Sequence, residues 1–369
     1  MADKKVEFHY LNQPEMIKAG VMNMTDCVDV MEKTFSIMGR GDYILGGPSH
    51  NHHGMMIQFP KDPKGPKMPV EGPDRRFMAC VSYLGGDYHL CGTKWYGSNS
   101  DNLKKNLPRS IHLIIINDPE TGVPIAMMEG NLISAMRTGA VVGLGARYLA
   151  SPEGQMAGII AAGPISRTCL MALAVGLPQL REARVYDLDY KKALLFSKEM
   201  SQELDIDVHP VANIQDAVRD CDAVSTAASG KTIPKFDKNW FKDGAYFALS
   251  SNADLPDELW LNSKLVADNW KMHIDWREEI NSKNHSKIPI HGKLHGLIKS
   301  RKISDEDISE MGDIVTKKKN VIRGGGSVNI FLTGGMGIED ISWAYEIYKK
   351  AIKKSLGKSL KLWDTPYLY

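Results

Sequence analysis

The sequence predicts an α/β protein in which a doubly wound parallel sheet is inserted into a second, α+β domain. From residue 156 onward, short apolar runs alternate with helical patterns, which is typical of parallel strands joined by helices. Before residue 130, strand-like runs follow one another across turns, and after residue 341 the chain returns to a single amphipathic helix. A chain of 369 residues also suits two domains better than one.

The first third of the chain predicts a helix followed by mostly antiparallel strands. Thr25 or Asp26 can cap a helix that ends near Gly39. A stretch rich in Gly, Pro and His over 41–73 predicts loop and hairpin. The strand-like runs after it cover residues 77–84, 89–96, 111–117 and, beyond a turn at 118–122, 123–128.

The middle of the chain predicts the parallel sheet, introduced by an Ala- and Gly-rich helix over 134–149. The expected strands are 156–162, 183–186, 207–211, 223–226 and 245–250, with helices at 165–175, 191–204 and 214–219 between them. Segments at 265–268 and 303–314 could complete this part. We therefore predict one domain over 134–321. A second would be formed by 1–133 and 322–369, with a helix at 341–356.

The composition is that of a cytoplasmic enzyme that binds neither nucleic acid nor membranes. Hydrophobic residues make up 43% and charged residues 24%, and the net charge of +2 provides no basic surface for nucleic acid. The N-terminus lacks the apolar segment of a secretory signal, and no uncharged apolar run could span a membrane. The five cysteines are scattered without a CxxC pair, which predicts neither disulfides nor a zinc site.

The strand–helix junction IIAAGPISR lies where a dinucleotide-binding turn belongs. In the GxGxxG fingerprint, the first glycine makes the tight turn, the second lets the backbone approach the pyrophosphate, and the third lets helix and strand pack closely. Ala161, Gly163 and Ser166 hold these positions here, so only the middle glycine is kept, and Pro164 and Ile165 open the helix. The junction and its surroundings predict a Rossmann-type domain.

Asp187 ends the next expected strand, where an acidic residue accepts hydrogen bonds from the adenine ribose. A carboxylate at this position repels the 2′-phosphate of NADP, so we predict NAD as the cofactor. Lys191 and Lys192 nearby keep NADP as an alternative.

Three residues outside this turn are candidates for the chemistry. Lys94, expected at a strand end, is either solvated or able to bind a carboxylate or shuttle a proton. Arg137 lies among small apolar residues, where it makes either a salt bridge within its helix or a contact with a substrate carboxylate. Asp254 follows an expected parallel strand and is either an acid/base or a helix N-cap.

The order of several short motifs resembles the ornithine cyclodeaminase/mu-crystallin family. These motifs are TKW, EGNLISAMRTGA, ARYLAS, the strand–helix turn described above, VYD, the Asp after a strand, and FLTGGMGIED. The resemblance implies an NAD(P) domain inserted into a substrate-binding and dimerisation domain, and a homodimer. It implies that Lys94 and Arg137 bind the substrate carboxylate and that Asp254 is catalytic. Thr138 and Gly139 would face the cofactor phosphate. Thr226, Ala227 and Ser250 would line the cofactor at strand ends.

The sequence departs from the family pattern in the segment that is expected to bind the substrate. The family commonly has an Arg in a Pro-x-Arg context after the first helix, and this chain has Pro48-Ser-His50 there. His50 is therefore a candidate substrate contact. His50, His52 and His53 also invite a metal interpretation, but no Cys or carboxylate stands nearby at a recognised spacing, so we predict no metal.

The resemblance and these departures predict an NAD(P)-dependent oxidoreductase that acts at the C–N bond of an amino acid or of a cyclic or opine-type imine. One alternative is an ornithine cyclodeaminase-type ammonia lyase that gives a cyclic amino acid. A second is a non-catalytic NAD(P)-bound binding protein or an accessory subunit. The expected partner in the first case is a small amino-acid or imine substrate.

Overall fold

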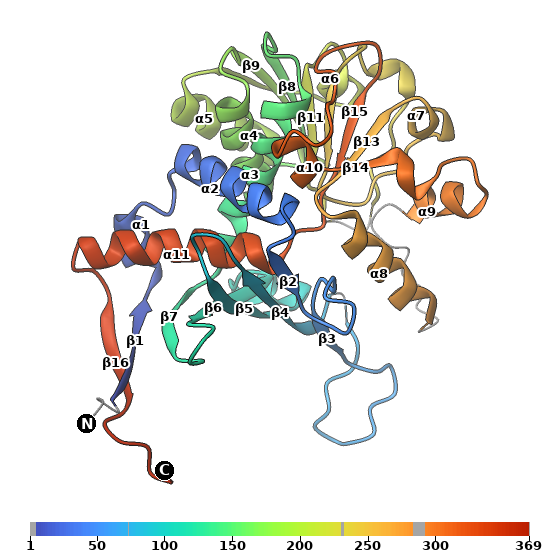
Figure 1. The fold of residues 1–369 in the computed structure, drawn as a ribbon. Coiled ribbons are helices and arrows are strands. Elements are labelled where there is room, and N and C mark those ends of the chain that lie inside the picture. The colour runs from blue at the N-terminus through green and yellow to red at the C-terminus, as the bar shows by residue number, and fades with distance from the viewer. Residues whose placement is uncertain (1–4, 73, 230–231, 283–291, 369) are drawn as a thin grey trace. The chain divides into compact units, whose positions relative to one another are not determined.

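The computed structural model describes residues 5–72, 74–229, 232–282 and 292–368 (Figure 1). The chain forms two compact units. Unit 1 comprises Met1–Asn23, Gly41–Ser134 and Met336–Tyr369. Unit 2 comprises Met24–Arg40 and Ala135–Gly335.

Unit 1 is built on one mixed sheet in which every pairing is antiparallel except that of its strands β1 and β7. The strand order is β16-β1-β7-β6-β5-β4-β2, and β3 pairs with β4. The expected strands of the first third become β4 to β7, whereas β1 and β16 were not predicted. The strands are β1 (Val6–Leu11), β2 (Tyr43–Leu45), β3 (Met55–Gln58), β4 (Arg76–Leu84), β5 (Leu90–Ser98), β6 (Ser110–Asn117), β7 (Pro124–Glu129) and β16 (Lys358–Trp363).

Helix α11 (Gly337–Lys353) packs on one face of β4, β5 and β6. Two glycines allow this close approach: a Cβ atom at Gly92 would lie 2.8 Å from Ile341 Cγ2, and one at Gly337 would lie 2.8 Å from Ser82 Oγ. Because side chains alternate across a strand, the face under α11 carries Met78, Cys80, Lys94 and other inward residues. Unit 1 also contains α1 (Gln13–Ala19) and η1 (Ser100–Lys105).

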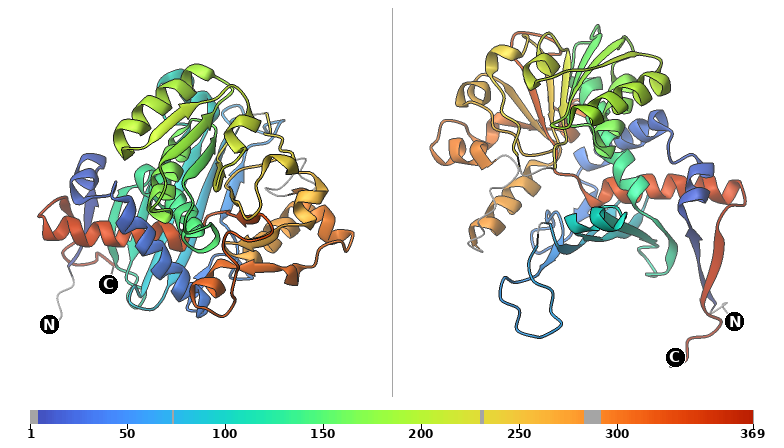
Figure 2. Two further views of the ribbon diagram at one scale, coloured as in Figure 1. Left: turned by 90° about the horizontal axis from the view of Figure 1, so that it is seen from above. Right: turned by 180° about the vertical axis from the view of Figure 1, so that it is seen from behind.

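Unit 2 contains a fully parallel sheet of order β10-β9-β8-β11-β12-β15-β13-β14, which confirms the predicted doubly wound fold class. Helices cover both of its faces (Figure 2). Its strands are β8 (Met156–Ile160), β9 (Glu182–Tyr186), β10 (Asp207–Pro210), β11 (Ala223–Thr226), β12 (Tyr246–Leu249), β13 (Lys264–Ala267), β14 (Ile308–Glu310) and β15 (Asn329–Leu332). Its helices are α2 (Met24–Gly39), α4 (Pro164–Gly176), α5 (Tyr190–Leu204), α6 (Ile214–Val218), α7 (Asp257–Leu261), α8 (Trp270–Ser282), α9 (Gly292–Lys299) and α10 (Met311–Val315), besides η2 (Lys238–Trp240) and η3 (Asp305–Asp307).

The sequence explains both covered faces. Val224, Phe247 and Ile330 face a core built with α6, α7 and α9. On the opposite face, α3 (Asn131–Leu149) lies close to the sheet because it is rich in glycine: a Cβ atom at Gly145 would lie 2.6 Å from Phe331 Cδ1. The parallel strands are buried on both faces and therefore read as continuous apolar runs.

The predicted boundaries differ from the observed units at two places. Residues 322–335 belong to unit 2, because β15 is fully buried between β12 and β13. The first long helix, α2, also belongs to unit 2, where it packs on α4 and α10. The segment 303–314, expected to help complete the parallel-sheet domain, lies in unit 2 and forms η3, β14 and α10. Among the described residues, no helix has the length and apolarity needed to cross a membrane.

Candidate functional site

The turn between β8 and α4 has the geometry of a phosphate-binding turn. Ala161 adopts a φ of 79°, the left-handed conformation that favours glycine, and its N–H donates to Tyr186 O over 2.7 Å. Gly163 is the N-cap of α4 with no side-chain cap, and Pro164 occupies the first turn. A Cβ atom added at Gly163 would meet no atom within 4 Å. No side chain caps this helix end, and there is room beside Gly163.

Asp187 joins this turn to the next one. Its Oδ2 accepts from the Ala162 N–H over 2.8 Å, and its Oδ1 accepts from the Asp189 N–H over 2.9 Å. The side chain is half-buried. Because each carboxylate oxygen has two lone pairs, both can still accept a hydrogen bond from a ribose hydroxyl.

The other predicted cofactor residues follow neighbouring strands at the same edge of the sheet. Thr226 ends β11, and its carbonyl accepts from the Ser250 N–H over 3.1 Å. Ala227 donates to Ile160 O over 3.4 Å. Ser250 accepts from Thr333 Oγ1 over 2.8 Å. Carboxyl ends of parallel strands form the ligand edge of such sheets, and these residues lie at that edge.

Helix α3 carries Arg137 and Thr138. Thr138 is half-buried, and Gly139 beside it lies against α4, since a Cβ atom there would overlap the Thr168 carbonyl. Arg137 is only 6% exposed, and its guanidinium packs against Gly335. Arg137 is therefore the buried arginine that the sequence predicts.

Lys94 lies in the middle of β5, not at a strand end as predicted, and is only 4% exposed. Its inward position follows from strand alternation, because Leu90 and Tyr96 share its face. Its Nζ lies 2.7 Å from Asp340 Oδ2 and 3.4 Å from Ser134 Oγ. The solvated interpretation of this lysine is wrong. The buried ion pair with Asp340, which lies in the first turn of α11, was not predicted.

A second cation shares the face of Lys94 and was also missed. The Arg76 guanidinium and the Lys94 Nζ each lie 5.8 Å from the centroid of the Tyr96 ring. Arg76 pairs with Asp74, whereas its buried Nε–H has no hydrogen-bond partner within the described ranges. Strand alternation could have found it, since Arg76 has the same parity as the buried Met78.

The neighbours of Asp74 favour the ionised form of its carboxyl group. Burial alone would raise its pKa, but Arg76, the Ser98 hydroxyl and Arg109 outweigh burial and hold the pKa below its ordinary value. Arg109 Nε lies 2.6 Å from Asp74 Oδ2.

Asp254 follows β12 in a loop and is half-exposed. Its carboxylate oxygens lie 4.0 Å from Lys235 Nζ and 3.9 Å from Lys293 Nζ. It does not cap α7, whose N-cap is Pro256, so the N-cap interpretation is wrong.

The histidine loop is built from a tight turn and not from a ligand cluster. His50 is exposed with a φ of 60°, and its N–H donates to Gly47 O over 3.1 Å. The His52 ring lies against Gly47, where a Cβ atom would overlap it. In the part of the chain that the structure describes, no three His, Cys, Asp or Glu side chains gather as a metal site would require.

Comparison with known proteins gives consistent results. The model of the ornithine cyclodeaminase/mu-crystallin family matches residues 21–355. N-((2S)-2-amino-2-carboxyethyl)-L-glutamate dehydrogenase of Staphylococcus aureus is 28% identical over 97% of this chain and 99% of its own. Alanine dehydrogenase of Archaeoglobus fulgidus is 27% identical over 92% and 95%, respectively. The structure of Thermococcus litoralis Δ(1)-pyrroline-2-carboxylate reductase, in complex with NADH and L-proline, is 26% identical with a TM-score of 0.79, covering 96% of this chain and 100% of that one.

Proposed function

Because the chain belongs to the ornithine cyclodeaminase/mu-crystallin family, as its motifs predicted, we propose that it is an NAD-dependent oxidoreductase acting at the C–N bond of an amino acid or an imine. The relatives named above are dehydrogenases and a reductase of such compounds, and they match nearly the whole chain. We place this activity ahead of the cyclodeaminase alternative.

The observation that carries the proposal is the buried ammonium of Lys94. Its Nζ forms an ion pair with Asp340 Oδ2 over 2.7 Å and donates to Ser134 Oγ over 3.4 Å. We propose that this ammonium also donates to a substrate carboxylate. The ion pair with Asp340 fixes the position of this ammonium within unit 1.

Two arginines are our further candidates for anionic groups of the substrate. Arg76 offers an orphaned Nε–H on the same face of the sheet as Lys94. Arg137 offers a guanidinium, whose planar fork suits a carboxylate. Asp254 is our candidate acid/base, since it follows β12 at the carboxyl edge of the parallel sheet. His50 is a weaker candidate for substrate contact, because it is exposed.

We propose that the strand edge of unit 2 binds NAD(H): the oxidised form would accept a hydride from an amine-bearing carbon, and the reduced form would donate one to an imine. The α4 N-terminus with Gly163, Pro164 and Ile165 would hold its pyrophosphate, with Thr138 beside it. Asp187 would accept from its adenine ribose, and Thr226, Ala227 and Ser250 would line its nicotinamide end.

We further propose a homodimer formed through the outer face of the unit 1 sheet. Five large side chains on this apolar face are 39% to 50% exposed: Phe77, Val81, Trp95, Ile111 and Leu113. Phe77 and Trp95 stack at 5.8 Å between ring centroids, and Trp95 pairs directly with Leu113. A contiguous exposed apolar surface is typical of a protein–protein interface, and a second copy of the chain is our candidate for its partner.

All five cysteines are free, which supports a reducing compartment such as the cytoplasm.

The function is tested by following NADH absorbance with a panel of amino acids, opines and cyclic imines. We expect turnover of at least one panel member with NAD(H), and loss of turnover in Lys94→Ala and Asp254→Asn. If purified protein binds no NAD(H), the proposal is wrong. If both variants retain full activity, the residue assignments are wrong while the activity stands.

A further inference from the structure

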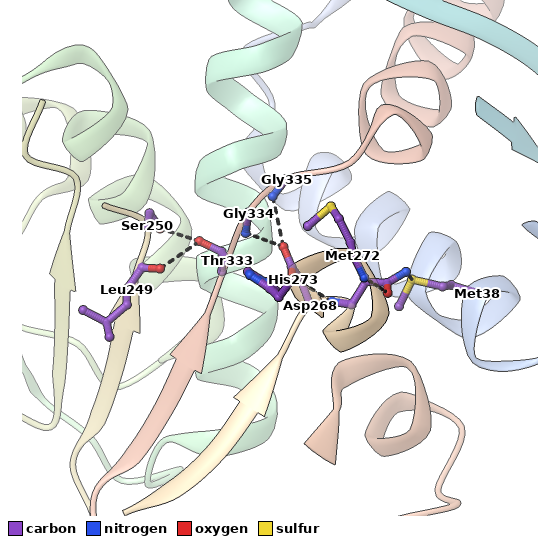
Figure 3. Close-up of polar contacts among 10 residues, drawn as sticks. Met38, Leu249, Ser250, Asp268, Met272, His273, Thr333, Gly334 and Gly335 are labelled. Carbon is purple, nitrogen blue, oxygen red and sulfur yellow. Dashed lines mark hydrogen bonds and ion pairs between the residues drawn. The ribbon is translucent and has the colours of Figure 1, made fainter. Parts of the chain in front are cut away.

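A fully buried carboxylate lies at the end of β13, and none of the roles above uses it. Asp268 has no exposed surface, and four donors surround its two oxygens (Figure 3). Oδ1 accepts from the Asn269 N–H over 2.7 Å and lies 2.9 Å from His273 Nε2. Oδ2 accepts from the Gly334 N–H over 2.6 Å and the Gly335 N–H over 3.0 Å.

Asp268 is an anion in this setting. Burial alone would raise its pKa, but the His273 ring and the two glycine N–H groups outweigh burial and lower the pKa. His273 is itself 1% exposed, and its ring stacks on Trp270 at 5.6 Å between centroids. Burying an ionised group is expensive unless every oxygen is hydrogen-bonded, as it is here.

Through these hydrogen bonds, the Asp268 carboxylate fixes the backbone just after β15. Gly335 has a φ of 80°, so this turn needs glycine. Gly334 lies close to the end of the Met272 side chain, since a Cβ atom there would lie 2.6 Å from Met272 Cε. On its other side the segment is tied to β12, since Thr333 Oγ1 donates to Ser250 Oγ over 2.8 Å (Figure 3).

The backbone at Gly335 lies directly against the guanidinium of Arg137. A Cβ atom at Gly335 would overlap Arg137 Nη1 and lie 3.2 Å from its Cζ and Nη2. The chain of contacts therefore runs from His273 through Asp268 to Gly335, and from Gly335 to Arg137.

We propose that Asp268 and His273 are positioning residues for Arg137, setting where its guanidinium meets a carboxylate of the substrate. This proposal rests on the proposed role of Arg137 in binding an anionic group. His273 fixes the carboxylate, the carboxylate fixes the glycine turn, and the turn fixes the guanidinium. Neither Asp268 nor His273 touches substrate.

The first experiment compares four variants that disturb successive links. His273→Gln keeps an amide N–H that can donate to Asp268, whereas His273→Leu removes the donor. Gly335→Ala pushes directly on Arg137, and Arg137→Ala removes it. We assay each with L-alanine, L-proline and N-((2S)-2-amino-2-carboxyethyl)-L-glutamate, using NAD. We expect KM to rise about tenfold in His273→Leu and Gly335→Ala, with kcat within about threefold and His273→Gln close to wild type.

A second readout needs neither turnover nor cofactor. Phenylglyoxal modifies arginine, and peptide mass spectrometry gives the rate at each site. We expect Arg137 to react at least about threefold faster in His273→Leu than in wild type or His273→Gln, because the turn at Gly335 that covers its guanidinium becomes more mobile. Arg109, which belongs to unit 1, serves as the internal control and should react at an unchanged rate.

The outcomes separate the two proposals. If Arg137→Ala leaves KM unchanged, its substrate role fails, while the phenylglyoxal rates still test the positioning. If Arg137→Ala raises KM but His273→Leu and Gly335→Ala do not, and Arg137 reactivity is unchanged, the positioning proposal alone is overturned. Equal stability loss in His273→Leu and His273→Gln, without change at Arg137, would mean a purely structural pair.

Discussion

The carboxylate of Asp187 accepts a hydrogen bond from the backbone N–H of Ala162, which ties the turn after β9 to the turn after β8. The residue that we propose to bind the adenine ribose therefore also braces the turn that we propose to bind phosphate. A change at Asp187 should affect both the affinity for NAD and the choice between NAD and NADP.

We predict that Asp187→Ser lowers NAD affinity at least about tenfold, since hydrogen bonds to a charged group contribute roughly 1.5–3 kcal/mol. It should also reduce the preference over NADP, because the repulsion of a 2′-phosphate is removed. Fluorescence titration with NADH and NADPH measures both quantities. Asp189→Ser is the matched control, since serine can still cap α5 while a neighbouring charge is lost. An unchanged NADH/NADPH ratio in Asp187→Ser would contradict the assignment.

Ala161 predicts a second result at the same turn. An L-residue in the left-handed region costs about 1 kcal/mol, so Ala161→Gly should bind NADH as tightly as wild type without a loss of stability. Ala161→Val should lower the unfolding free energy by about 2 kcal/mol and weaken NADH binding, because a β-branched side chain is strained further at positive φ. Urea unfolding and NADH titration test both. Tight binding by Ala161→Val would show that this turn does not hold the cofactor.

Sequence patterns were sufficient to predict the strands of the parallel sheet, but they did not predict which polar side chains pair with each other. Buried parallel strands appear as apolar runs, so β8, β9, β11 and β12 could be located from local sequence alone. The boundary predicted at residue 322 excludes β15 from the parallel sheet, because the neighbours of β15 in that sheet, β12 and β13, come from distant parts of the chain. The same reason hid Asp340: Lys94 was identified, but its partner lies on a helix at the other end of the sequence.

Removing both members of the Lys94–Asp340 pair should restore stability that is lost when Lys94 alone is removed, but it should not restore activity. Lys94→Met leaves a buried carboxylate without this cation and should lower the unfolding free energy by about 3–5 kcal/mol. The double variant Lys94→Met/Asp340→Asn should recover much of this loss but no activity, because the donor for the substrate carboxylate is still missing. Urea unfolding and steady-state assays are compared on the same preparations. Ser134→Ala is a mild control, since its contact with Lys94 is long at 3.4 Å. Activity in the double variant would rule out the role given to Lys94.

The proposed dimer depends on the apolar face of the unit 1 sheet. Trp95→Glu should convert the dimer to monomer in sedimentation velocity, because a buried unpaired charge costs several kcal/mol at an interface. Leu194→Glu is the control: Leu194 is 54% exposed but lies on α5 of unit 2. If wild type sediments as a monomer, or if Trp95→Glu remains dimeric, this face is not the interface.

His295 predicts how stability depends on pH. Burial, Arg277 and His273 together lower its pKa from 6.5 to about 4, so the ring is neutral in the folded protein throughout the range between these values. The unfolded chain takes up a proton below pH 6.5 and the folded chain does not until about pH 4, so stability falls as the pH is lowered through this window. At pH 5 the loss from this residue is about 2 kcal/mol, given about 1.4 kcal/mol for each pH unit below 6.5.

The matched variant is His295→Phe. A phenyl ring keeps the stacking on Trp270, which places the two ring centroids 5.8 Å apart, and Nδ1 of His295 has no hydrogen-bond partner to lose within the described residues. We expect similar unfolding free energies for wild type and variant at pH 7, and a variant that is about 2 kcal/mol more stable at pH 5. Urea unfolding at the two pH values measures the difference. Parallel loss of stability in both proteins would mean that His295 is protonated in the fold at pH 5, and that its burial does not resist the charge.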